Sequence, residues 1–228
     1  MDHLEHYREH GYAVVKGVFD RREVGELSLA FDRLYARALG YGASFRHQNV
    51  LFRLGDDPNV GRIVRMVQWP SYVDPVLARY RNDPRMLAIL APLLGDDLKQ
   101  IINQMHWKPP GAQAVEWGYH QDIRSRRPRE AYRSPAASYI QTGIAIDPHG
   151  EENGAMTVVP GSHRLGSCRR RAARSWTARS AIATSSTSVS IRAMSSTCAS
   201  IPATSRSGTC TPSTARARTA RRSTGASI

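Results

Sequence analysis

The chain has 228 residues, of which 41% are hydrophobic and 22% charged, and its formal net charge is +13. No apolar run approaches the 18 residues of a membrane helix, and Met1 to Glu5 lack the basic and apolar regions of a secretory signal. All three cysteines lie between residues 168 and 210. The earlier part therefore encodes no disulfide framework, and a reducing, cytoplasmic location is expected.

The first part of the chain predicts two helices that flank one strand. A polar helix is expected over residues 3–10 and a Val-rich strand over residues 12–18. Asp20 and Glu23 then have the spacing of a capping box, with Asp in place of the usual Ser or Thr. The helix that follows carries apolar residues three and four positions apart, a stripe typical of core-facing helices, and is expected to end at Gly40 to Gly42.

The middle of the chain predicts one more helix and then mainly strands. Asp83 and Pro84 form a helix start that leads an apolar segment up to Gly95. Strands are expected over residues 51–54, 98–107, 138–146 and 157–159, with a turn at 56–59. Helices that precede strands indicate an α+β fold, or a mostly β fold with a helical N-terminal layer.

Charge and residue types divide the sequence in two near residue 165. Residues 1–165 hold all 19 acidic residues and 21 of the 32 Lys and Arg residues, a net charge of about +2. In residues 166–228, Ser, Thr, Ala and Arg fill 48 of 63 positions and no acidic residue occurs. This tail has too few large apolar residues to offset the entropy of ordering. We expect a folded unit over 1–165 and a tail that is disordered or held only in isolated short elements.

The basic charge by itself is typical of nucleic-acid-binding proteins. Here the excess belongs to the tail, which contains 11 Arg but no Lys, and whose one aromatic residue is Trp176. Sites for single-stranded nucleic acid usually interleave several aromatic residues with the basic ones. We therefore expect no nucleic-acid partner, and a basic tail that binds anions or nucleic acid ranks last among the alternatives.

The segment from Trp117 to Asp122, Trp-Gly-Tyr-His-Gln-Asp, carries the clearest chemical signal. Residues two apart on an extended chain point to the same side, so His120 and Asp122 can direct an imidazole and a carboxylate at one divalent metal ion. They would supply two of the three ligands of a 2-His-1-carboxylate triad, which leaves positions for a co-substrate and dioxygen. A hydrogen-bonded surface histidine beside an aspartate is the ordinary alternative.

Two flanking blocks give this pair a context. The upstream block, Asn103 to Gly111, ends in Lys-Pro-Pro-Gly, and the downstream block, Asn153 to Arg164, contains Asn-Gly and Pro-Gly-Ser-His. With His-Gln-Asp between them and the Tyr7 to Phe19 stretch before them, the sequence resembles the phytanoyl-CoA dioxygenase family of iron(II)- and 2-oxoglutarate-dependent oxygenases. The resemblance covers about residues 1–165.

The resemblance implies a double-stranded β-helix, a cupin-like jelly roll with iron(II) in its mouth. It also implies that 2-oxoglutarate is oxidised to succinate while dioxygen hydroxylates a small-molecule or acyl substrate. His120 and Asp122 match the family's first two iron ligands. Gln104 matches a position that lines the 2-oxoglutarate site, and Gln141 falls near another. From the residues alone, Gln104 could equally be an ordinary inward-facing polar residue of a strand.

Other polar residues near these blocks have simpler interpretations. Lys108 is expected to be a solvated loop residue, and His106, which shares a strand face with Gln104, a core histidine. His163 follows a turn and is expected to form a local hydrogen bond rather than to bind metal. The arginines of the loop over residues 123–137 are read as solvated, with contact to an acidic substrate as the alternative.

The resemblance breaks down after residue 165. The family requires a second histidine and, about ten residues later, an arginine, but no histidine follows His163. We therefore expect an incomplete jelly roll whose C-terminal part does not fold as such, and a chain that is inactive as written. A non-enzymatic remnant is the alternative. The tail composition is typical of GC-rich DNA read out of frame, and a shifted reading from Ser213 gives His-Gly-Thr-Gly-Pro-Asn. We expect an insertion or deletion near codons 164–170.

Overall fold

The computed structural model describes residues 2–113, 117–132, 134–148 and 155–165, together with four strands of the tail. Its elements, in chain order, are α1 (His3–His10), β1 (Tyr12–Val15), α2 (Arg21–Leu39), β2 (Phe45–His47), β3 (Val50–Asp57), β4 (Gly61–Gln68), η1 (Pro70–Tyr72), α3 (Pro75–Arg81), α4 (Pro84–Leu94), β5 (Ile102–Lys108), β6 (Trp117–His120), η2 (Asp122–Ser125), η3 (Arg129–Ala131), α5 (Pro135–Ser138), β7 (Ile140–Ile144), β8 (Thr157–Val158), η5 (Ser162–Leu165), β9 (Ser180–Ala181), β10 (Val189–Ala193), β11 (Ala199–Ile201) and β12 (Arg221–Ser227).

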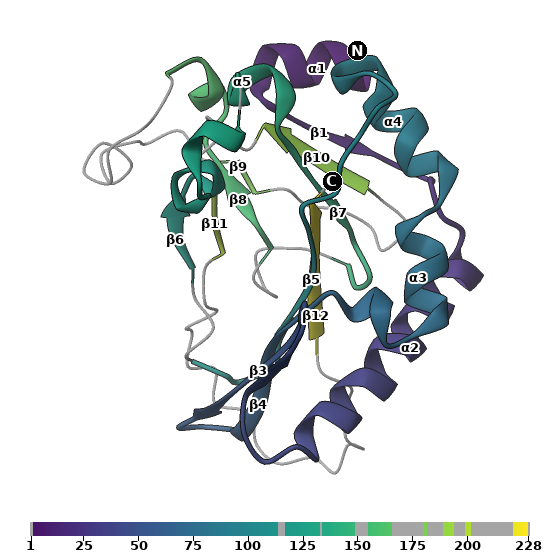
Figure 1. The fold of residues 1–228 in the computed structure, drawn as a ribbon, viewed down its shortest axis with the longest axis vertical. Helices are drawn as coiled ribbons and strands as arrows, with labels where there is room; N and C mark the ends of the chain where they lie inside the picture. Colours follow the sequence, from purple (N-terminus) through teal and green to yellow (C-terminus); the bar gives the residue numbers. More distant parts are fainter. Residues whose placement is uncertain are drawn as a thin grey trace, which may run out of the picture.

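The strands form two sheets, and the expected mostly β fold with N-terminal helices is confirmed. The larger has eight strands in the order β1-β10-β7-β12-β5-β4-β3-β2, and the smaller has four in the order β6-β11-β8-β9. Helices α2, α3 and α4 lie along one side of the large sheet, and the small sheet lies on its other side (Figure 1). No described helix is long and apolar enough to cross a membrane.

The two N-terminal helices are confirmed because they rest on local signals, whereas the strand predicted over residues 12–18 ends at Val15. Helix α1 has the predicted bounds, and the capping box of α2 is complete: Asp20 Oδ1 accepts from the Glu23 backbone N–H, and Glu23 Oε2 accepts from the Asp20 N–H, both at 2.8 Å. The apolar stripe of α2 is buried. Phe31 from that stripe meets Trp107 of β5 edge-on, with 6.0 Å between ring centroids. The stripe therefore joins the helix layer to the large sheet.

Two regions of the large sheet differ from the prediction. Strand β4 was not predicted, because residues 61–68 bury neighbouring positions in pairs instead of alternating. Strand β3 continues to Asp57, which was assigned to a turn. Asp57 is buried because its carboxylate accepts from the backbone N–H groups of Asn59, at 3.0 Å, and Gln113, at 2.8 Å. These bonds satisfy an aspartate at the end of a strand.

The tail contributes four separate strands, and each pairs with a strand from residues 1–165. Strand β10 lies between β1 and β7, β12 between β7 and β5, and β9 and β11 in the small sheet. These strands lie within both sheets, whereas the tail composition predicts disorder or isolated short elements. Strand pairing uses backbone N–H and C=O groups. The tail strands can therefore pair without the alternating hydrophobic residues by which a strand is recognised in sequence.

Candidate metal and co-substrate site

The two faces of β5 have different surroundings. Met105 and Trp107, with 0% and 1% of their surface exposed, belong to the main core under the helices. Alternation therefore places Gln104, His106 and Lys108 on the opposite face, toward the small sheet. In β7, Ile140 and Ile144 belong to the same core, so Gln141 likewise faces away from the helices. The polar residues named by sequence reasoning thus line one face, which we call the inner face.

His120 and Asp122 come together at the end of β6. The strand ends at His120, Gln121 keeps an extended backbone with φ −115° and ψ 122°, and Asp122 begins η2. The His120 Nε2 atom lies 3.3 Å from Asp122 Oδ1, and their side chains are 39% and 19% exposed. The predicted geometry is present, since both side chains point to one partly solvent-accessible place. Their role as metal ligands stays a prediction.

The donor atoms fit two neighbouring positions around a divalent ion. Two ligand atoms that each lie about 2.1 Å from an ion, at a right angle, are about 3 Å apart, close to the 3.3 Å between His120 Nε2 and Asp122 Oδ1. A neutral imidazole and a carboxylate suit iron(II). Among the described residues, no three His, Cys, Asp or Glu side chains are grouped closely enough to hold a metal ion. The two side chains thus match two of the three ligand types of a 2-His-1-carboxylate triad.

His106 lies within electrostatic reach of this pair. Burial lowers the pKa of His106 to about 4, against the opposing effect of Asp122, which raises it. The positive charges of Lys108, His120 and Arg53 add to the lowering. His106 is thus held neutral at physiological pH, in agreement with its interpretation as a core histidine.

Lys108 was predicted to be a solvated loop residue, and this prediction was wrong. It is the last residue of β5 and only 9% exposed. The strand continues up to Pro109, so the alternation that directs Gln104 and His106 inward also directs Lys108 inward. The inner face therefore carries a buried cation that sequence reasoning assigned to solvent, and the two-residue spacing from His106 was the signal that could have found it.

Gln104 and Gln141 lie on strands separated only by β12. Gly225 of β12 pairs with Gln104, and Ser227 pairs with Gln141. Gln141 is buried with 7% exposure, and Gln104 is half-buried. Gly225 and Ser227 are two positions apart, so the register places Gln104 and Gln141 on one face of the sheet. Their contact with a co-substrate stays a prediction.

The remaining candidates have structural partners. The His163 ring forms a hydrogen bond with the backbone carbonyl of Arg8, and its Nε2 atom lies 3.1 Å from that oxygen. His163 thus has a hydrogen-bond partner far away in the sequence instead of the expected local one. In the loop after Asp122, Arg126 Nε donates to the Tyr139 hydroxyl at 2.7 Å. Arg127 donates to the backbone oxygens of Arg124, at 2.9 Å, and Arg126, at 2.7 Å.

The two sheets, eight-stranded and four-stranded, have the layout of the cupin-like, double-stranded β-helix fold. The family model "Phytanoyl-CoA dioxygenase (PhyH)" matches residues 7–211 of the chain. The chain therefore belongs to the phytanoyl-CoA dioxygenase family. The match extends past residue 165, where the resemblance seen in the sequence stops.

Curated relatives are similar over part of their length. The chain is 24% identical over 159 residues to a probable alpha-ketoglutarate-dependent hypophosphite dioxygenase of Stutzerimonas stutzeri. The aligned region covers 69% of this chain and 51% of the relative. It is 24% identical over 163 residues to an ectoine dioxygenase of Bordetella bronchiseptica, and this aligned region covers 72% of the chain and 49% of the relative. The chain thus spans about half the length of the curated relatives it matches.

Solved structures share the fold. AviO1 from Streptomyces viridochromogenes superimposes with a TM-score of 0.72 at 19% identity, covering 99% of this chain and 93% of its own. EctD from S. alaskensis with bound Fe gives a TM-score of 0.66 at 18% identity, covering 98% and 74%. The epimerase SnoN, solved with Fe3+ and alpha ketoglutarate, gives 0.67 at 21% identity, covering 99% and 81%. Iron and 2-oxoglutarate, the expected cofactors, are thus present in structures of this fold.

Proposed function

We propose that this fold is built for the oxidation of a small organic substrate by iron(II), 2-oxoglutarate and dioxygen, and that the chain as written carries an incomplete metal site. The observation that carries the proposal is the approach of His120 Nε2 to Asp122 Oδ1 at 3.3 Å, beside the polar inner face of the large sheet. Membership of the phytanoyl-CoA dioxygenase family supports the same chemistry. Bound iron(II) would supply the centre at which 2-oxoglutarate and dioxygen react.

The chain's own residues have distinct roles in this proposal. His120 and Asp122 hold the metal. His106, kept neutral by burial, adds no positive charge next to it. The buried ammonium group of Lys108 attracts the dianionic co-substrate, and the amide of Gln141 orients it by hydrogen bonds. Together these groups would favour binding of a metal ion with an anionic co-substrate over binding of a neutral molecule at the inner face.

A third protein ligand is absent from the part of the chain that the structure describes. No histidine occurs after His163, and the described residues contain no third His, Cys, Asp or Glu grouped with His120 and Asp122. Two protein ligands hold iron(II) weakly, so the 228-residue chain turns over 2-oxoglutarate slowly or not at all. A frame change is expected near codons 164–170, and it would place a histidine at Ser213 and Thr214. Apart from residues 164 and 165, these positions lie outside the described residues.

Iron-dependent succinate formation tests the proposal. The chain as written is expected to form succinate no faster than the His120→Ala variant, whereas a chain whose frame is restored after codon 164 forms it at a measurable rate. Succinate formation by the chain as written that His120→Ala abolishes would show the site to be complete. Absence of turnover in the frame-restored chain would contradict the oxygenase assignment and leave the non-enzymatic remnant in its place.

A further inference from the structure

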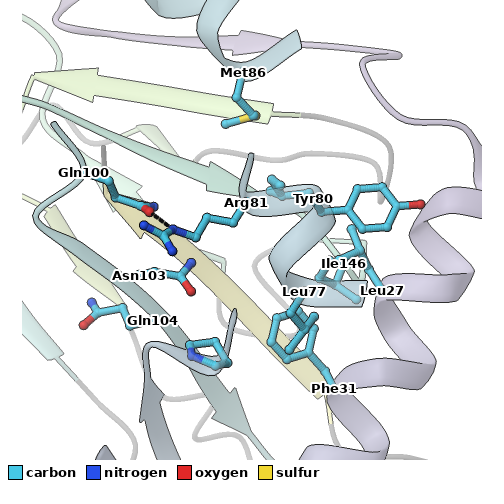
Figure 2. Close-up of a pocket in the computed structure, with 12 residues that line it drawn as sticks. Leu27, Phe31, Leu77, Tyr80, Arg81, Met86, Gln100, Asn103, Gln104 and Ile146 are labelled. Carbon is cyan, nitrogen blue, oxygen red and sulfur yellow. Dashed lines mark hydrogen bonds between the residues drawn. The ribbon is translucent and has the colours of Figure 1, made fainter. Parts of the chain in front are cut away.

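A pocket lies on the helix-covered face of the large sheet, on the opposite side from His120 and Asp122. The empty space within it, with open solvent at its mouth included, is about 540 Å³. Figure 2 shows the side chains that line it. Its apolar wall comes from α2, α3, α4, β7 and the residues after β7, and consists of Leu27, Phe31, Leu77, Met86, Ile144 and Ile146.

One corner of this pocket holds a cation. Arg81, the last residue of α3, donates from Nε to the Gln100 side-chain oxygen. Its guanidinium carbon also lies 4.9 Å from the ring centroid of Trp69 and 5.3 Å from that of Tyr72. No carboxylate among the described residues is within 4.0 Å of the guanidinium nitrogens. The guanidinium is thus held in place by neutral groups, with donors left for an anion.

The same corner holds a buried acceptor. Asn103 shares the helix-covered face of β5 with Met105 and Trp107, and its Oδ1 atom is buried without a hydrogen-bond partner. In Figure 2 the Asn103 amide lies beside the Arg81 guanidinium. Buried polar atoms in proteins are nearly always paired. An acceptor that lacks a donor and a cation that lacks an anion therefore lie together at the edge of an apolar cavity.

We propose that this pocket binds an amphiphile with an apolar chain and a hydroxy-carboxylate head. The chain lies against the apolar wall, Arg81 donates hydrogen bonds to the carboxylate, and the hydroxyl donates to Asn103 Oδ1. Each polar group of the corner then has a partner of matching type. Gln104 lines this pocket as well, whereas His120 and Asp122 do not.

Calorimetry on the full chain tests this, with EDTA present so that bound metal cannot contribute. The probes are 2-hydroxyoctanoate and octanoate, which differ only in the hydroxyl. We expect saturable binding of 2-hydroxyoctanoate, weakened about tenfold or more by Arg81→Met, because a charge-assisted hydrogen bond is lost. Arg22→Met removes the same charge from an exposed position of α2 and is expected to leave binding unchanged.

The hydroxyl is tested separately. The chain is expected to prefer 2-hydroxyoctanoate over octanoate several-fold, and Asn103→Leu, which keeps the side-chain size, is expected to abolish that preference. The proposal is overturned if the unaltered chain shows no saturable binding, or if Arg81→Met binds as tightly as Arg22→Met. It is equally overturned if Asn103→Leu retains the preference for the hydroxy acid.

Discussion

His120 Nε2 lies 3.3 Å from Asp122 Oδ1 although the two residues belong to different elements, the end of β6 and the start of η2. The residue between them, Gln121, keeps the extended backbone of the strand and is only 3% exposed. The side chains after β6 therefore continue to alternate from side to side for one residue beyond the paired part of the strand. This extension brings an imidazole and a carboxylate to one place.

The register of the small sheet indicates where a third ligand could be added. Ala199 of β11 pairs directly with His120, and directly paired residues of antiparallel strands share a face with Cβ atoms about 5 Å apart. Ala199→His is therefore expected to raise iron(II) affinity about tenfold or more, measured by anaerobic calorimetry. Ala199→Leu, which adds a side chain without a ligand atom at the same position, is the matched control. Equal affinities for the two variants would contradict the prediction.

Lys108 is expected to bind the co-substrate. Removing its charge with Lys108→Met should weaken 2-oxoglutarate binding about tenfold or more in anaerobic equilibrium dialysis with iron(II), because a buried charge-assisted contact is lost. Lys99→Met removes the same charge from an exposed position and should leave binding unchanged. If both variants bind 2-oxoglutarate equally well, Lys108 has no part in the site.

His106 makes stability depend on pH. Its folded-state pKa of about 4 lies below the ordinary value of 6.5, so between these values the unfolded chain binds more protons and stability falls as the pH falls. Urea unfolding at several pH values should show that His106→Asn flattens this dependence by about 1 kcal/mol per pH unit between pH 4.5 and 6. His47→Asn, at an exposed position of β2, should leave the slope unchanged. An unchanged slope in His106→Asn would contradict the burial of a neutral imidazole.

Arg85 joins the starts of α2 and α4. Its guanidinium donates to Glu23 Oε1 at 2.6 Å and to Asp83 Oδ2 at 2.7 Å, which lowers the pKa of both carboxyls. The Arg85 side chain is 41% exposed. Solvent screening therefore limits the expected cost of Arg85→Met to about 1–2 kcal/mol in urea unfolding at pH 7. The corresponding change at Arg79, whose ion pair with Glu26 is more exposed, should cost less.

The pH dependence of the Arg85→Met effect follows from the lowered carboxyl pKa values. The stabilisation by Glu23 and Asp83 is fully present above the pKa values of the unfolded chain and is lost as the pH falls through the lower folded-state values. The difference between the unaltered chain and Arg85→Met should therefore shrink below about pH 4. A difference that stays constant down to pH 2 would exclude this charge network as its cause.

Local signals made the N-terminal helices and the approach of His120 to Asp122 predictable from sequence. The capping box of α2 and the His-x-Asp alternation depend on residues within a few positions of each other. Three other features depend on distant partners. Lys108 is buried because β5 continues to it. The tail strands exist as backbone ladders with earlier strands. The Arg81 and Asn103 corner forms only where a helix end meets a strand, so no sequence pattern predicts it.

The central claim is that His120 and Asp122 form a partial iron site, and an anaerobic calorimetric titration with iron(II) tests it most directly. The chain as written is expected to bind one iron(II) weakly but saturably, His47→Ala to bind it with the same affinity, and His120→Ala to show no saturable heat. Equal iron(II) binding by His120→Ala and the chain as written would contradict the account.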